Sequence, residues 1–119
     1  GDNQDDNDTL LIWLNGGPGC SSMVGSLFEN GPVVTSPFPA GTPHTEERPP
    51  LVRNPYSWTK ATAMLYVEQP VGIGFSKGPD DYEPQNEEEL SRDFHGFLRS
   101  FFVTFEDLTH RKLFMFGES

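Results

Sequence analysis

The sequence predicts an α/β fold organised around a mostly parallel sheet, on the basis of its apolar runs and one helical stripe. Short unbroken apolar runs occupy residues 10–14, 63–67 and 113–116, and such runs are typical of strands buried on both faces. An amphipathic helical pattern separates the last two runs. Because parallel strands need long crossover connections, strand, helix and strand in this order indicate a parallel sheet.

The chain begins with a polar, acidic segment, residues 1–9, which we expect to be an exposed leader ahead of the folded part, residues 10–119. The leader carries a glycosylation sequon at Asn7, which favours a secretory route only weakly. The first predicted strand, residues 10–14, ends abruptly in a turn that is rich in glycine.

A short helix is predicted to start near Ser22 and to end before Gly31. Serine is a good N-cap residue, and the apolar residues after it fall at near-helical spacing: Met23, Leu27 and Phe28. Residues 35–55 are rich in Pro, Thr and Gly, and we expect them to form an ordered loop without regular structure.

The second half of the chain predicts a strand, a long helix and a further strand. Residues 63–67 form the first strand, acidic residues 77–89 are expected to be exposed, and the helix begins at Glu87. Glycine inside a helix costs roughly 1 kcal/mol relative to alanine, so we expect close packing at Gly96. Residues 113–116 form the last strand. The apolar stripe of the helix comprises Leu90, Phe94, Phe97, Leu98, Phe101, Phe102 and Phe105.

The composition argues against several classes of partner. The formal net charge is -10 and there is no basic stripe, so neither nucleic acids nor anionic membrane surfaces are expected as partners. No apolar run approaches the ~20 residues that span a bilayer. The spacing of histidine with cysteine and carboxylates does not resemble a zinc site, and no metal or cofactor is expected. The single cysteine, Cys20, is either a small buried thiol or half of a disulfide whose partner lies outside this sequence.

Gly117-Glu118-Ser119 is the first half of the pattern Gly-x-Ser-x-Gly. The full pattern places a serine on a sharp turn between a strand and a helix, where neighbouring side chains would clash. Three residues are a weak signal alone, but these follow a predicted buried strand directly. Ser119 is therefore a candidate nucleophile.

The glycine-rich loop after the first strand predicts either an oxyanion hole or a plain tight turn. Acyl transfer places negative charge on a former carbonyl oxygen, and glycines allow backbone N–H groups to point at that oxygen. The loop lacks the Gly-Lys-Ser/Thr ending of a phosphate loop and the pattern Gly-x-Gly-x-x-Gly.

Four motifs, in order along the chain, resemble those of the serine carboxypeptidase family, and the first is highly specific. They are Asn15-Gly16-Gly17-Pro18-Gly19-Cys20-Ser21-Ser22, Asn54-Pro55-Tyr56-Ser57-Trp58, Glu68-Gln69-Pro70-Val71-Gly72-Ile73-Gly74-Phe75-Ser76 and Gly117-Glu118-Ser119. The resemblance implies a partial α/β-hydrolase fold, with residues 10–119 as the N-terminal portion of a single catalytic domain. It also implies removal of single residues from the C-termini of peptides or proteins, in a vacuolar, lysosomal or secreted setting.

The resemblance implies roles for individual residues. Ser119 matches the nucleophile, and Gly17 matches the residue whose backbone N–H is one oxyanion-hole donor, the other coming from the residue after the serine. Cys20 matches a disulfide-bonded cysteine with its partner elsewhere. The family's catalytic aspartate and histidine are expected beyond residue 119, so these residues alone are expected to be inactive. The group that holds the substrate's free carboxylate is matched by Trp13, Asn15, Gly16, Glu29 and Glu118.

Two glutamates, Glu29 and Glu118, suit recognition of an anionic chain end. Two close carboxyls cannot both ionise cheaply, so one keeps a proton that it can donate to the substrate. Two other functions stay open, namely a serine carboxypeptidase-like acyltransferase and a non-catalytic relative that binds a partner. Glu118, rather than aspartate, before the serine favours the peptidase. The sequence does not indicate an oligomeric state.

Overall fold

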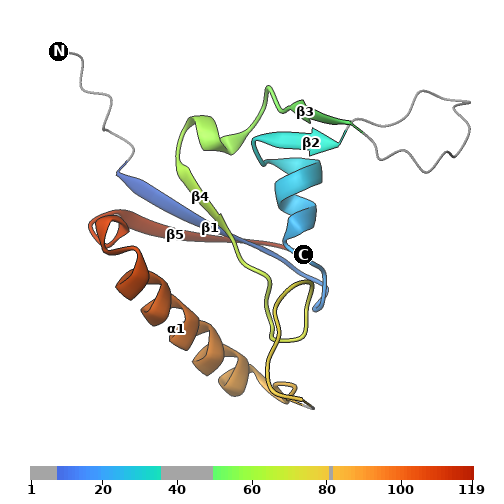
Figure 1. The fold of residues 1–119 in the computed structure, drawn as a ribbon, viewed down its shortest axis with the longest axis vertical. Coiled ribbons are helices and arrows are strands. Elements are labelled where there is room, and N and C mark those ends of the chain that lie inside the picture. Colours follow the sequence, from blue (N-terminus) through green and yellow to red (C-terminus); the bar gives the residue numbers. More distant parts are fainter. Residues whose placement is uncertain (1–7, 36–49, 81) are drawn as a thin grey trace, which may run out of the picture.

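The computed structural model describes residues 8–35, 50–80 and 82–119, and its core is a three-stranded parallel sheet (Figure 1). The strands are β1 (Thr9–Asn15), β4 (Ala63–Tyr66) and β5 (Lys112–Glu118), in the order β4-β1-β5. Both pairings of β1 are parallel. The three apolar runs therefore form strands as predicted, and the parallel arrangement is confirmed.

The central strand β1 is the most buried element of the sheet. Leu10 and Ile12 are 2% and 0% exposed, and β1 has a hydrogen-bonded strand on each edge. The strand begins at Thr9, so the predicted leader overlaps it by that residue. Asp8 belongs with the sheet as well, since its carboxylate lies 3.1 Å from the ammonium of Lys112 at the start of β5.

A short helical segment follows β1, as predicted. The hydroxyl of Ser21 accepts a hydrogen bond from the backbone N–H of Met23, which satisfies one of the free donors at a helix start. The segment continues as a π-helix, η1 (Gly25–Glu29).

The expectation that residues 35–55 form an ordered loop without regular structure is wrong in part. Strand β2 (Val33–Thr35) pairs with β3 (Leu51–Arg53) to form a separate antiparallel ribbon. All of β3 is exposed, so it lacks the apolar alternation by which a sequence reveals a half-buried strand. The segment 36–49 of the expected loop lies outside the described residues.

The long helix, α1 (Glu87–Thr104), begins where the sequence predicts. Its N-cap is Asn86, whose side chain accepts a hydrogen bond from the backbone N–H of Glu89 at 2.9 Å. Two 3-10 helices complete the fold: η2 (Trp58–Lys60) precedes β4, and η3 (Glu106–Leu108) leads into β5.

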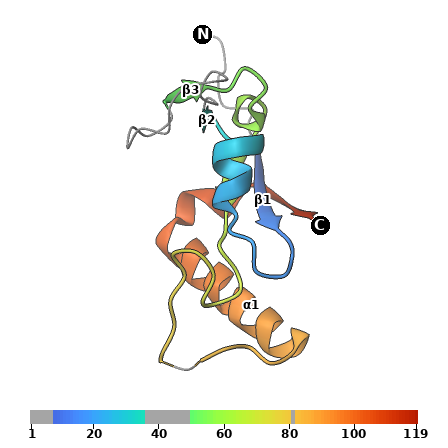
Figure 2. The ribbon, with the colours of Figure 1, turned by 90° about the vertical axis from the view of Figure 1, so that its right-hand side faces the viewer.

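The apolar stripe of α1 faces β4 across a cavity of about 510 Å3. Both elements contribute apolar walls, and α1 lies on one side of the sheet while η1 and the ribbon lie on another (Figures 1 and 2). The apolar residues of these walls are Leu65 of β4, Val67 directly after it, and Leu90, Phe94, Phe97 and Phe101 of α1. The expectation of close packing at Gly96 is wrong, because a Cβ built there meets no described atom within 4 Å.

Strand β5 is exposed along its whole length, although it is as apolar as β1. Its four consecutive apolar side chains are 42–59% exposed, and they are Leu113, Phe114, Met115 and Phe116. Large contiguous exposed apolar surfaces and unpaired strand edges promote association between chains. Within the described residues, no helix is both long and apolar enough to cross a membrane.

We predict that residues 1–119, expressed alone, associate or remain loosely packed because of the exposed apolar strand β5. Sedimentation of the purified chain should show oligomers, and replacing Phe114 and Met115 with threonine should reduce them. A monomer with one sharp thermal unfolding transition would contradict this expectation.

Candidate active site

The candidate site lies where the carboxyl ends of β1 and β5 meet. In the parallel register Asn15 of β1 is paired with Glu118 of β5. The glycine-rich loop follows β1 and Ser119 follows β5, so the loop and the serine lie at the same edge of the sheet. Figure 2 shows this loop and the C-terminus at the ends of these two strands. Ligands of open parallel sheets bind at this edge.

The glycine-rich loop approaches the serine closely. A Cβ built on Gly16 would lie 2.4 Å from the carbonyl oxygen of Glu118 and 2.4 Å from the carbonyl carbon of Ser119. Only glycine fits at such a distance. Gly17 has a φ of +123°, a conformation that side chains other than hydrogen disfavour. Both glycines line one cavity of about 460 Å3 together with Ser119.

Ser119 adopts a φ of +56°, in the left-handed region. It is the one residue other than glycine with a positive φ in the described parts of the chain. Such a conformation costs of order 1–3 kcal/mol, and strained residues of this kind cluster at functional sites. A serine held in this conformation directly after a strand is compatible with the sharp turn of Gly-x-Ser-x-Gly.

Asn15 links the two strands through its side chain. Its Oδ1 accepts hydrogen bonds from the indole N–H of Trp13 at 3.0 Å and from the backbone N–H of Gly25 at 3.1 Å. Because two donors occupy the oxygen, the amide nitrogen must point the other way, and it donates to Glu118 Oε2 at 3.2 Å. The orientation of this buried amide is thereby fixed.

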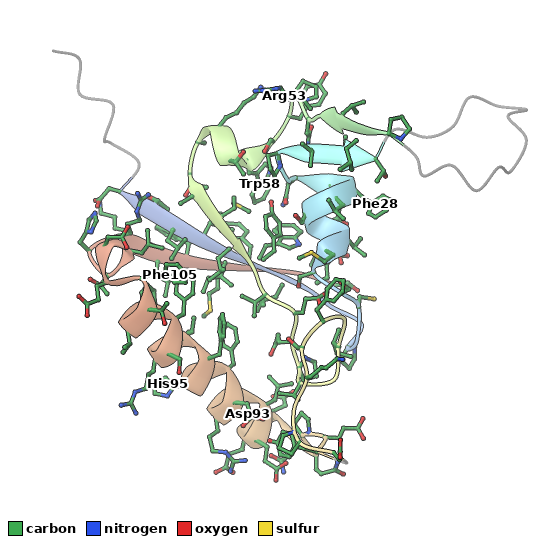
Figure 3. The ribbon with its side chains drawn as sticks, viewed as in Figure 1. Phe28, Arg53, Trp58, Asp93, His95 and Phe105 are labelled. Carbon is green, nitrogen blue, oxygen red and sulfur yellow. The ribbon has the colours of Figure 1, made fainter. Side chains whose placement is uncertain are left out.

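An aromatic column supports the indole of Trp13. Trp58 packs edge-on against Trp13, with ring centroids 5.4 Å apart, and against Phe116 of β5 at 5.8 Å. Trp58 lies in the part of the molecule that holds the ribbon β2–β3 (Figure 3). Edge-to-face pairs of this kind are favourable beyond the area they bury. Trp58 belongs to the second sequence motif, but its contact with Trp13 was not predicted.

Glu29 stands apart from the other predicted carboxylate-binding residues. Its side chain is exposed at the end of η1, and no hydrogen bond joins it to Glu118 within the described chain. Burial, reinforced by the negative charge of Glu29, raises the pKa of the Tyr66 phenol. The structure thus brings Trp13, Asn15, Gly16 and Glu118 together, and the sharing of a proton between the glutamates stays a prediction.

Two serines pin the glycine-rich loop to the end of β4. The hydroxyl of Ser22 accepts from the backbone N–H of Asn15 at 3.1 Å and donates to the carbonyl of Val67 at 2.6 Å. The hydroxyl of Ser21 donates to the carboxylate of Glu68, which also accepts from the backbone N–H of Phe75. These hydrogen bonds lower the pKa of Glu68, with the one from Phe75 contributing most.

Sequence reasoning missed Glu68 as a member of the site. Its carboxylate joins the turn over residues 72–76 to the loop that carries Gly17, across 47 residues of sequence. The one available signal was its position at the start of the third motif.

Two other predictions concern the periphery of the site. Cys20 is exposed, so the alternative of a buried thiol is wrong, and the disulfide stays a prediction. Asn7, the predicted glycosylation site, lies outside the described residues. Among the residues that are described, no group of three or more His, Cys, Asp or Glu side chains could hold a metal ion.

Replacing Glu68 with glutamine should make the free energy of unfolding depend less on pH in the acidic range. The pKa of Glu68 is lowered below 4.5 in the folded state, so its carboxylate stabilises the fold above pH 4.5 and loses this effect as pH falls through the folded pKa. In urea titrations of the full-length protein, Glu68→Gln should be less stable than the parent at pH 6, with the difference shrinking toward pH 3. The exposed Glu83→Gln is the control for removal of one negative charge. A difference that stays constant with pH would contradict the role of Glu68.

Comparison with known proteins identifies relatives along the whole chain. The sequence model of the family described as serine carboxypeptidase matches residues 1–119. A carboxypeptidase Y homolog of Arthroderma benhamiae is 42% identical over 118 residues, which cover 99% of this chain and 21% of the relative. The lysosomal protective protein of Mus musculus is 38% identical over 117 residues, covering 98% of this chain and 23% of the relative. The chain therefore spans about a fifth of the length of these relatives.

A solved structure agrees with these sequence matches. It is that of Kex1(delta)p, a prohormone-processing carboxypeptidase from Saccharomyces cerevisiae, with a TM-score of 0.78 and 32% sequence identity. The match covers 98% of this chain and 24% of the other. The predicted fold class, a partial α/β-hydrolase fold, is confirmed. Because the family is matched over all 119 residues and by relatives at 38–44% identity, this chain belongs to the serine carboxypeptidase family.

Proposed function

We propose that the full-length protein containing this sequence is a serine-type carboxypeptidase that releases C-terminal amino acids from peptides and proteins. The observation that carries the proposal is the hydrogen bond between Asn15 and Glu118, directly beside Ser119. It joins the predicted carboxylate-binding group to the predicted nucleophile, as cleavage of the last peptide bond requires. The carboxypeptidase names of the relatives support the same activity.

In the proposed reaction the hydroxyl of Ser119 attacks the last peptide carbonyl of the substrate. The general base takes the proton of the hydroxyl as a bond forms between Oγ and the carbonyl carbon, and it passes this proton to the leaving amine as the C–N bond breaks. Water then hydrolyses the ester and restores the serine. The described residues that line the cavity around Ser119 include no histidine, so the proposal assigns the base to another part of the full-length protein.

The negative charge on the tetrahedral intermediate would be met by the backbone N–H of Gly17. The conformation of this glycine and the close approach of Gly16 to Ser119 support the assignment. The second donor would be the backbone N–H of the residue after Ser119. Each such donor typically contributes a factor of about 10²–10³ to the rate.

The substrate's terminal carboxylate would be bound by neutral donors. The amide nitrogen of Asn15 has two hydrogens, and Glu118 accepts one of them, which leaves the other for the substrate. The backbone N–H of Gly16 and a protonated Glu29–Glu118 pair would complete the group, with Trp13 orienting Asn15. A shared proton is retained at acidic pH, which suits the vacuolar, lysosomal or secreted location that we propose. One relative is named as lysosomal.

The pH dependence of carboxylate recognition tests this function. The full-length parent should release C-terminal residues, and Ser119→Ala should abolish this release. The ratio of kcat/KM for a free-acid peptide over its amidated counterpart should fall as pH rises from acidic to neutral, because a deprotonated glutamate pair repels the carboxylate. Glu118→Gln should flatten this fall, since an amide donates without titrating. An unchanged profile in the variant would contradict the carboxylate-binding role.

Adding one methyl group at Gly16 should also reduce activity. The new Cβ of Gly16→Ala would lie 2.4 Å from the backbone of Glu118 and Ser119, so the loop with the Gly17 donor must move away. We expect kcat/KM to fall by about 10²–10³, the effect of losing one oxyanion donor. Gly96→Ala is the matched control, because its Cβ meets no described atom and activity should stay unchanged. Equal activity of the two variants would contradict the placement of the oxyanion hole.

A further inference from the structure

Asn54, the residue after β3, is a buried polar hub whose contacts converge on the end of η1. Its side chain is 5% exposed, and its amide nitrogen donates to the carbonyl oxygens of Glu29 at 3.0 Å and Gly31 at 2.9 Å. Its Oδ1 accepts from the backbone N–H of Tyr56 at 2.9 Å. The amide is therefore fully used, and its orientation is fixed in the same way as that of Asn15.

The position of Glu29 depends on these contacts because its helical segment is short. Carbonyl groups at the end of a helix have no partner inside the helix, and η1 has only five residues and no basic residue near its end. Asn54 supplies the missing donors from 25 residues away in sequence. Its backbone N–H also bonds to Pro32, so the start of the ribbon β2–β3 is held to the same point.

No described hydrogen bond holds the Glu29 side chain itself. The carboxylate is exposed, and the one described hydrogen bond to Glu29 from outside η1 is the bond from Asn54 to its carbonyl. The next residue, Asn30, is held through its carbonyl by Ser57 and Trp58 and through its side chain by Tyr66. The backbone around Glu29 is thus anchored, and the anchor that reaches Glu29 itself is Asn54.

We propose that Asn54 is a positioning residue that holds Glu29 where it can meet the terminal carboxylate of a peptide substrate. The inference rests on the proposed function, which assigns that carboxylate to Glu29 and Glu118. Asn54 does not reach the reacting atoms. It acts through the backbone of Glu29, while Asn15 is held by Ser22 and Glu118.

The substitution Asn54→Asp separates this role from general stabilisation. Aspartate has the same shape, but an oxygen replaces the nitrogen that donates to Glu29 and Gly31, so two carbonyls face a carboxylate. Binding of a free-acid peptide should weaken roughly tenfold, the loss of one hydrogen bond to a charged group, and binding of the amidated peptide should not change. Asn54→Ala removes the donors without adding a charge and should show the same selectivity, to a smaller degree.

The experiment measures dissociation constants for a matched pair of peptides, one with a free C-terminal carboxylate and one amidated. The full-length protein carries Ser119→Ala throughout, so that peptides bind without being cleaved. Binding is measured for Asn54 and for Asn54→Asp, each combined once with Glu29 and once with Glu29→Gln. Ser100→Asp is the control for one added negative charge, because Ser100 is exposed on α1 and does not line the cavity around Ser119.

The proposal requires that Asn54→Asp reduce the free-acid preference with Glu29 present and have no further effect in Glu29→Gln. Equal weakening of both peptides, an undiminished effect in Glu29→Gln, or failure of both Asn54 variants to fold would show that Asn54 serves the fold alone. If the parent binds both peptides equally, the proposed function fails. If the parent prefers the free-acid peptide and Asn54→Asp leaves that preference unchanged, only the proposed role of Asn54 is overturned.

Discussion

The parallel pairing of β1 with β5 is the constraint on which the rest of the site depends. It places Asn15 opposite Glu118, and the turns after these residues carry the glycine-rich loop and Ser119. A shift of the register by one residue would turn each side chain to the opposite face of the sheet and break the hydrogen bond between them. The buried side chains of β1 hold this register, because a shifted strand would turn them toward solvent.

The site is assembled from dipoles rather than from charges. The described residues around Ser119 that line its cavity include one acidic side chain, Glu87, and no Lys or Arg. The chain carries a net charge of -10, so an anionic ligand gains nothing from long-range attraction. The proposed recognition of a carboxylate would therefore rely on uncharged donors at short range, namely amide and backbone N–H groups and a protonated carboxyl. Such groups need fixed directions, which explains why Asn15 and Asn54 are buried with both ends of their amides engaged.

Much of this arrangement could be predicted from the sequence. The strands of the sheet were predictable from unbroken apolar runs, and α1 was predictable from an apolar stripe with the helical period. The glycine-rich loop was predictable because its motif is highly specific, and Ser119 because its short motif directly follows a predicted strand. Exposed β3 has no such period, so the ribbon could not be predicted. The roles of Glu68 and Asn54 were missed because each joins segments 25–47 residues apart, and hydrogen bonds of that span leave no local pattern. The expected packing at Gly96 failed because an exposed helical glycine and a tightly packed one look alike in sequence.

The long sequence separation between Asn15 and Glu118 has a consequence for folding during synthesis. The amide of Asn15 and the carboxylate of Glu118 are 103 residues apart, so the chain must close a long loop before they meet. Contacts of this kind form late and slow the folding of sheet proteins. During synthesis β1 emerges first, and its edge that pairs with β5 stays unpaired until β5 has emerged. Until then the proposed nucleophile, Ser119, and the proposed recognition residue, Asn15, lie apart. The folding order would therefore keep the proposed peptidase inactive until its own polypeptide is folded.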